Sequence, residues 1–146
     1  MGYATDYKTL YQGLIDTIIA TTTFTSTNTT GAYIKDWAGV TYPTCMVRPM
    51  RDRLISTELG GALEVREARF KVIIKNTGTG TKANQDTIIG YVGEIIDKIK
   101  ASRNLGLSMA AEASDEDTDF SLSSDRNAVF YYAIMTIKVL WHRSTT

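Results

Sequence analysis

The C-terminal run Ala128–Trp141, AVFYYAIMTIKVLW, is the feature of this chain that most limits its fold. Its β-branched and aromatic residues favour a strand, and successive side chains of a strand point to opposite faces. One face would carry the odd-numbered residues from Val129 on, and the other would carry Phe130, Tyr132, Ile134 and Leu140. Both faces are apolar, so helices on one face would leave the second face for a protein partner, unless the chain's own helix and loops enclose the strand.

Two upstream segments have the spacing of amphipathic helices that could cover one face. In the first, apolar residues recur every three to four positions from Thr5 onward, with Thr5 or Asp6 as the expected N-cap and Gly13 off the apolar stripe. In the second, Asn84 or Asp86 is the expected N-cap. The two stripes are Tyr7, Leu10, Tyr11, Leu14, Ile18 and Ile19, and then Ile88, Ile89, Val92, Ile95, Ile96 and Ile99.

A long strand is predicted after the Gly60–Gly61 turn, because apolar and charged residues alternate there. The phase of this alternation slips by one residue at Glu67 and Ala68, which predicts a β-bulge or a bend. The apolar side of the strand would consist of Leu63, Val65, Ala68, Phe70, Val72 and Ile74.

A shorter strand is predicted over Thr44–Arg48, with Pro49 as its end. The threonine-rich stretch Thr21–Thr30 is expected to be a loop with some edge-strand character. Aromatic and apolar residues lead from that loop into Pro43, and these are Tyr33, Ile34, Trp37, Val40 and Tyr42.

Turns and loops are predicted between the remaining elements. The segment Asn76–Lys82, NTGTGTK, has the composition of a turn, as does Ser124–Asn127. Leu107–Ala113 could form a strand, whereas Glu112–Asp119, with five carboxylates in eight residues, is expected to be a solvated loop. This order of elements predicts a single α+β domain over residues 1–146, with a mainly antiparallel β-sheet and two amphipathic helices packed on one face.

Composition removes several classes of function. Sixteen basic and sixteen acidic residues give no net charge, which argues against a uniformly basic surface for nucleic acid or anionic membranes. The apolar runs are shorter than the roughly 20 residues that span a bilayer, and no basic segment precedes an apolar one at the N-terminus. The sequence therefore predicts an intracellular protein with no membrane partner.

Three candidate chemical sites fail in detail. The Gly78–Lys82 turn has neither the Gly-Lys-Ser/Thr of a phosphate-binding loop nor a third glycine for a dinucleotide. Asp115, Asp117 and Asp119 have the spacing of calcium-loop ligands, but the required glycine and terminal glutamate are missing, which leaves only a looser divalent-ion site open. His142 and Cys45 are single residues, so no zinc set can form. We therefore expect no enzyme activity and no cofactor.

Charge is segregated along the chain even though it sums to zero. Basic residues concentrate between Arg48 and Lys71, with Arg66 and Arg69 among them, and acidic residues concentrate in Glu112–Asp119. These runs would be two solvated faces, or complementary patches that meet between subunits of a ring, or a basic stripe along a pore through which nucleic acid passes. The sequence thus predicts a subunit interface that contains Phe130, Tyr132, Ile134, Arg66, Arg69, Asp115 and Asp117.

The layout of this chain resembles the tail terminator family of long-tailed bacteriophages, whose members are also called minor tail or tail-completion proteins. The resemblance is carried by four segments and their spacing rather than by a diagnostic motif. These are Tyr42–Val47, the strand Glu64–Ile74, the helix around Asp86–Ile89, and Ser124–Arg126 before the closing strand.

The resemblance implies a structural virion protein, assembled in the host cytoplasm. Such a protein forms a ring, usually of six subunits, on the head-proximal end of the tail tube. The ring ends tube polymerisation, contacts the tail tube protein and the head-completion or connector protein, and lets DNA pass through its lumen. Alternatives are a neck or head-completion connector on the portal side, a metal-dependent phosphoryl hydrolase and a small binding module.

Overall fold

The computed structural model describes residues 2–21, 23–31, 42–125 and 128–145. It contains two helices and a five-stranded sheet, which confirms the predicted α+β fold. The sheet has the order β1-β2-β3-β5-β4, and every neighbouring pair is antiparallel except β1 with β2. The elements are α1 (Tyr3–Ile19), β1 (Thr29–Thr30), β2 (Thr44–Glu58), the 3-10 turn η2 (Leu59–Gly61), β3 (Leu63–Gly78), α2 (Lys82–Ala101), β4 (Ala110–Asp125) and β5 (Ala128–Ser144).

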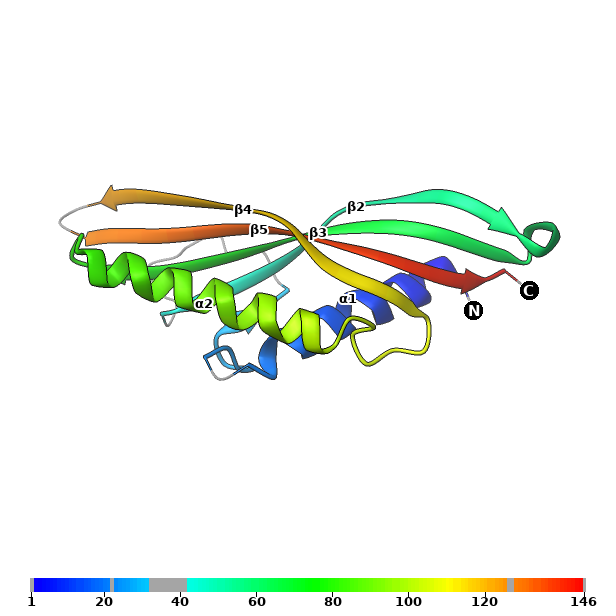
Figure 1. Ribbon diagram of the computed structural model, residues 1–146, viewed down its shortest axis with the longest axis horizontal. Helices are drawn as coiled ribbons and strands as arrows, with labels where there is room; N and C mark the ends of the chain where they lie inside the picture. Colours follow the sequence, from blue (N-terminus) through cyan, green and yellow to red (C-terminus); the bar gives the residue numbers. More distant parts are fainter. Residues whose placement is uncertain (1, 22, 32–41, 126–127, 146) are drawn as a thin grey trace.

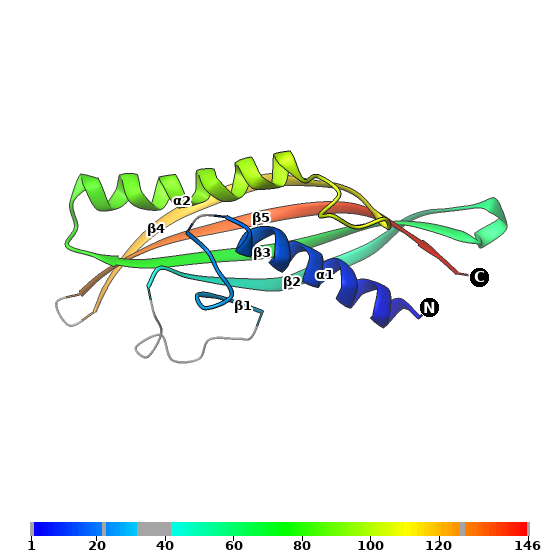
Figure 2. The same cartoon turned by 90° about the horizontal axis from the view of Figure 1, so that it is seen from below.

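Both helices lie on the same side of the sheet (Figure 1 and Figure 2). Neither helix is long and apolar enough to span a membrane. The core fills the space between helices and sheet, and every second residue of β5 from Tyr131 to Trp141 is buried in it. Leu10, Leu14 and Ile18 of α1 and Ile88, Val92, Ile95 and Ile99 of α2 complete the core, as their periodicity predicts.

The helix starts differ from the predicted ones. α1 begins at Tyr3 with Gly2 as its N-cap, so the assignment of Thr5 or Asp6 to that position is wrong. α2 is capped by Thr81, whose hydroxyl accepts a hydrogen bond from the Asn84 amide, rather than by Asn84 or Asp86. The predicted turn is correspondingly shorter, because β3 continues to Gly78.

Gly13 also lies on the buried face of α1, not off it as predicted. A Cβ atom there would lie 2.6 Å from Leu107 Cδ1, in the segment between α2 and β4. The glycine therefore lets that segment pack closely against α1.

β2 is three times longer than the five-residue strand predicted, because Pro49 does not end it. Proline lacks an N–H group, and sheets tolerate it at edges and bulges. Pro49 lies at an edge, because β1 pairs with β2 only at Cys45 and Met46. It also lies beside a bulge, because the register of β2 with β3 shifts between Pro49 and Arg51. β1 confirms the edge-strand character expected within Thr21–Thr30, whereas positions 33, 34, 37 and 40 lie outside the described residues.

The predicted bulge in β3 is wrong. β3 and β5 pair in continuous register from Leu63 with Ser144 to Gly78 with Val129. The even-numbered residues of β3 therefore face the helices throughout, which turns Glu64 and Arg66 inward and Leu63 and Val65 to the other face. The irregularities lie instead in the neighbouring β2.

The acidic run Glu112–Asp119 was predicted to be a solvated loop, and this prediction is wrong. The run lies in the edge strand β4, which pairs with β5 along most of its length. Charged side chains are common on edge strands because they oppose unwanted strand pairing. Ser124 and Asp125, which were predicted to begin a turn, belong to β4, and positions 126 and 127 of that predicted turn lie outside the described part of the chain.

Candidate functional site

The face of the sheet opposite the helices is the candidate functional surface, and we call it the open face. Within the described residues no helix or strand packs on it (Figure 1). On β5 it carries Phe130, Tyr132 and Ile134, the three aromatic and aliphatic residues predicted for an interface, and all three are half-buried. A partner on this face would complete the burial of these apolar side chains.

An aromatic cluster surrounds Lys75 at one end of the open face. The Lys75 ammonium lies 4.2 Å from the centre of the Phe130 ring and 5.0 Å from that of Tyr132, and the lysine is only 4% exposed. Burial would raise the pKa of Tyr132, but the hydrogen bond with Ser123 and the positive charge of Lys75 lower it. The rings and the cation attract each other, which holds Phe130 and Tyr132 in place on this face.

A chain of ion pairs crosses the middle of the open face from β2 to β4. Arg53 lies 3.3 Å from Glu67, Glu67 pairs in turn with Arg69, and Arg69 makes two hydrogen bonds to Glu116, of 2.8 and 3.1 Å. The hydrogen bond from Arg69 lowers the pKa of Glu116. This fork-to-fork contact spans β5 and fixes the predicted residue Arg69 against the acidic edge strand.

Arg66, also predicted for the interface, lies on the helix-covered face instead. Its guanidinium bonds to Asp52 at 2.6 Å and to Glu64 at 2.9 Å. The other oxygen of Asp52 accepts a 2.9 Å hydrogen bond from the Trp141 indole, and Arg143 joins Glu64 to Asp6 of α1. This polar network ties β2, β3, β5 and α1 together, so the charge of Arg66 is used within the subunit.

The two predicted acidic residues of β4 separate onto the two faces. Asp115 is paired with Ile137 on the helix side, and Asp117 is paired with Thr136 on the open face, because the strand bulges between them at Glu116. Within the described residues no three histidine, cysteine, aspartate or glutamate side chains converge as metal ligands. The alternate spacing of Asp115, Asp117 and Asp119 along the sequence therefore does not bring all three together.

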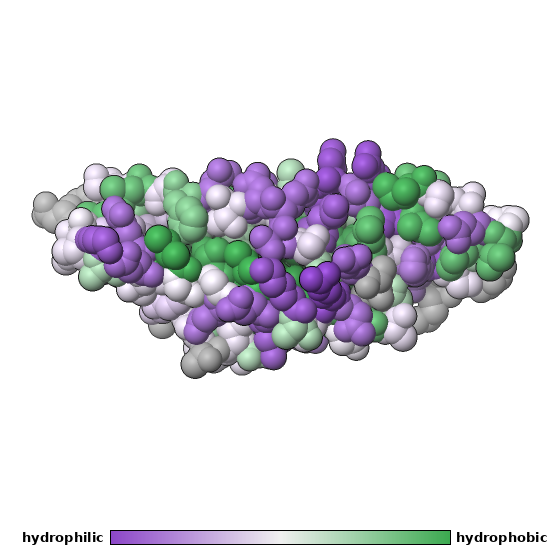
Figure 3. Space-filling model, in the orientation of Figure 1, coloured by the Kyte–Doolittle hydropathy of each residue, from purple (hydrophilic) through white to green (hydrophobic). Residues whose placement is uncertain are grey.

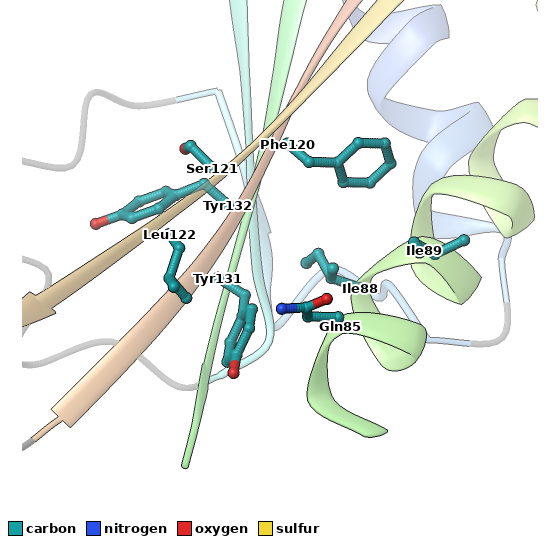
Figure 4. A pocket seen from close by; sticks show the side chains of 8 residues that line it. All are labelled: Gln85, Ile88, Ile89, Phe120, Ser121, Leu122, Tyr131 and Tyr132. Atoms are coloured by element: carbon teal, nitrogen blue, oxygen red, sulfur yellow. The ribbon is translucent and has the colours of Figure 1, made fainter. Parts of the chain in front are cut away.

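An apolar groove lies between α2 and β4 on the helix side. Ile88 and Ile89 line it from the helix, and Phe120 and Leu122 line it from the strand, where they are 52% and 58% exposed. In Figure 4 the Phe120 ring points towards α2, while Ser121 and Tyr132 project from the other side of the strands. The groove went unpredicted because Phe120 and Leu122 lie between the predicted loop and the predicted turn Ser124–Asn127 and were assigned to no element, although their alternation with serines is a strand signal.

The residues considered for chemistry take structural positions. Lys82 is the first residue of α2 and pairs with Asp86 at 2.8 Å. Cys45 is fully buried, and this burial raises the pKa of its thiol to about 12, which leaves almost no thiolate to act as a nucleophile. His142 is exposed near the end of β5.

The surface thus separates into regions of different polarity. Figure 3 shows hydrophilic residues over the middle of the sheet edge, and hydrophobic ones between β4 and α2 and near the β2–β3 hairpin.

Neither the protein-family models nor the curated proteins contain a match to this chain.

Proposed function

We propose that this chain is a structural virion protein that forms a ring at the head-proximal end of a phage tail tube. The ring ends tube polymerisation and offers the surface to which the head joins, and DNA passes through its lumen. This role requires self-association and distinct axial surfaces, but no chemistry.

The observation that carries this proposal is the open face of the sheet. Each copy keeps Phe130, Tyr132 and Ile134 half-buried there, beside a chain of charged residues. Leu140 is half-buried as well, so hiding what remains exposed of the four apolar β5 side chains of this face would contribute about 2 to 4 kcal/mol before the costs of association. Repeated contacts between copies are the simplest source of such cover.

The oligomeric state tests the proposal directly. We expect the purified protein to elute as a closed oligomer whose mass is a small multiple of 16.2 kDa, and to appear as rings in negative-stain electron microscopy. A protein that stays monomeric at high concentration, both alone and with tube protein, would contradict a ring.

The position of the ring needs a second experiment. Isolated tail tubes and tail-free heads can be offered separately as binding partners. Binding to tubes, with an arrest of their growth, supports the terminator role. Binding to heads alone would instead identify a head-completion connector on the portal side, which is the alternative that the same ring geometry allows.

A further inference from the structure

The two outer edges of the sheet have stretches that no strand of the described residues covers, although the Tyr11 hydroxyl donates to the Val47 carbonyl of β2 and the Ala113 amide of β4 donates to the Arg103 carbonyl. β4 is the last strand at one edge. At the other edge β1 pairs with β2 only at Cys45 and Met46, so within the described residues no strand pairs with the outer side of β2 beyond Met46. An exposed edge of this kind is a template for pairing with another chain.

The two edges carry opposite charge. On the open face, β2 presents Arg48 and Arg51, and β4 presents Asp117 and Asp119. Among the described residues none of these four side chains forms a hydrogen bond or a salt bridge within the subunit, although the charge of Arg51 acts on Glu116. The charges of Arg48, Asp117 and Asp119 are available to a neighbour.

Two of these charged residues, Arg48 and Asp117, also lie in the same cross-strand row of the sheet. The cross-strand pairs Arg48 with Lys71, Lys71 with Thr136, and Thr136 with Asp117 form one row across the sheet. A second copy placed beside β4 without an offset along the strands would therefore bring its Arg48 next to Asp117. Opposite charges directly across a strand pair are stabilising.

Symmetric pairing of the edges is disfavoured by the same charges. Two β4 edges would set carboxylates against carboxylates, and two β2 edges would set arginines against arginines. Only the contact of β4 with β2 is complementary. This contact uses different surfaces on the two copies, which is the kind of interface that closes into a ring or continues as a filament.

We infer that β4 of one copy pairs antiparallel with β2 of the next, with Asp117 facing Arg48. Asp119 and Arg51 then lie diagonal to this pair, one on each side of it. The inference rests on the proposed ring and specifies a contact through the sheet edges, which does not itself cover the open face. The antiparallel sense follows from the sheet, because β4 runs opposite to β5 and β3 runs opposite to both β5 and β2. A continued sheet would keep the helices of all copies on one side.

Charge reversal tests this pairing. One variant carries Asp117→Arg with Asp119→Arg, and a second carries Arg48→Glu with Arg51→Glu. Each variant alone has two edges of like charge, so we expect its assembly to weaken by about tenfold or more in sedimentation or light scattering, with an unchanged circular dichroism spectrum.

Mixing the two variants is the decisive measurement. The reversed β4 of the first then meets the reversed β2 of the second, and the native edges also complement each other, so we expect mixed assemblies that contain both chains. A chain with all four substitutions should likewise assemble by itself. This rescue separates a loss of pairing from a loss of folding.

The outcomes distinguish the inference from the proposed function. If the wild-type protein forms rings and both variants do so equally well, edge pairing is overturned while the ring stands. Variants that lose assembly but do not recover it on mixing would also overturn edge pairing. Rings retained by the Arg48→Glu, Arg51→Glu variant, with a loss of DNA retention, would assign β2 to nucleic acid instead. A monomeric wild-type protein would overturn both.

Discussion

The helix-covered face of the sheet and the open face are made from the same strands but hold their polar residues in different ways. On the covered face, Asp52, Glu64 and Arg66 bond inside the subunit beside the Trp141 indole. On the open face, the ion pairs from Arg53 to Glu116 lie partly in water, and Asp117 has no ion-pair partner among the described residues. Polar groups thus complete the core on one side and remain available for other contacts on the other.

The largest difference between the faces should appear in core truncations. Phe70 is fully buried and stacks on Tyr7 and Tyr11 of α1, with ring centres 5.7 Å apart in both pairs. We expect Phe70→Ala to lower the free energy of unfolding by about 3 to 5 kcal/mol, measured by urea denaturation. Ile134→Ala on the open face is the matched control, at about 1 to 2 kcal/mol in dilute protein. Equal losses would show that the open face is covered too.

The polar network of the covered face gives the next effect. Asp52 is bonded to Arg66, Tyr3 and the Trp141 indole, so Asp52→Ala leaves buried donors without an acceptor. We expect a loss of about 3 kcal/mol in the free energy of unfolding. Asp117→Ala on the open face should change it by less than about 0.5 kcal/mol. A small loss for Asp52→Ala would mean that water replaces the carboxylate.

Acid should weaken the ion pairs on both faces. Hydrogen bonds from Arg143 and Arg69 hold the pKa values of Glu64 and Glu116 below the usual 4.5. A lowered pKa in the folded state stabilises the protein above the unfolded value, and this stabilisation is lost as the pH falls through the folded value. We therefore expect the urea concentration at the midpoint of unfolding to decrease once the pH falls below about 4.5. At pH 7 we expect Glu116→Gln to unfold at a lower urea concentration than the wild-type protein, and we expect the two midpoints to coincide near pH 3. A difference between the midpoints that stays the same at both pH values would contradict the ion pair.

Thiol labelling compares the two faces with little effect on stability. Cys45 on the covered face has a pKa raised to about 12 by burial, whereas position 121 lies exposed on the open face of β4. In native protein at pH 8 we expect iodoacetamide to label Ser121→Cys at least about tenfold faster than Cys45. The two thiols should react alike in urea. Comparable native rates would mean that the strand around Cys45 opens readily.

The difference between the faces also explains which predictions failed. The alternation in β3 was misread at Glu67 and Ala68 because Glu64 and Arg66 were expected to face water. They turn inward because Asp52 and Arg143, from distant segments, supply opposite charges there. The sequence held only one local signal for this buried network. If the small residue Ala68 is taken to face the helices, every even-numbered residue from Glu64 to Asn76 faces the helices too, with no slip in phase.

The predicted interface residues meet a similar limit. Phe130, Tyr132, Ile134, Arg69 and Asp117 share the open face, whereas Arg66 and Asp115 lie on the other face. The strand pattern of β5 places its residues correctly because two-residue periodicity is local. The bulge at Glu116 separates Asp115 from Asp117, and no rule of spacing within the acidic run reveals it.

The sequence by itself determined the two helices, the long strands β3 and β5, and the apolar character of both faces of β5, because periodicity and side-chain type act within a few residues. Tertiary structure alone decided that the acidic run is a strand, since β5 supplies its hydrogen bonds and Arg69 compensates its charge. It also decided that β2 continues through Pro49, since the position of a strand at the edge depends on its neighbours rather than on its own residues.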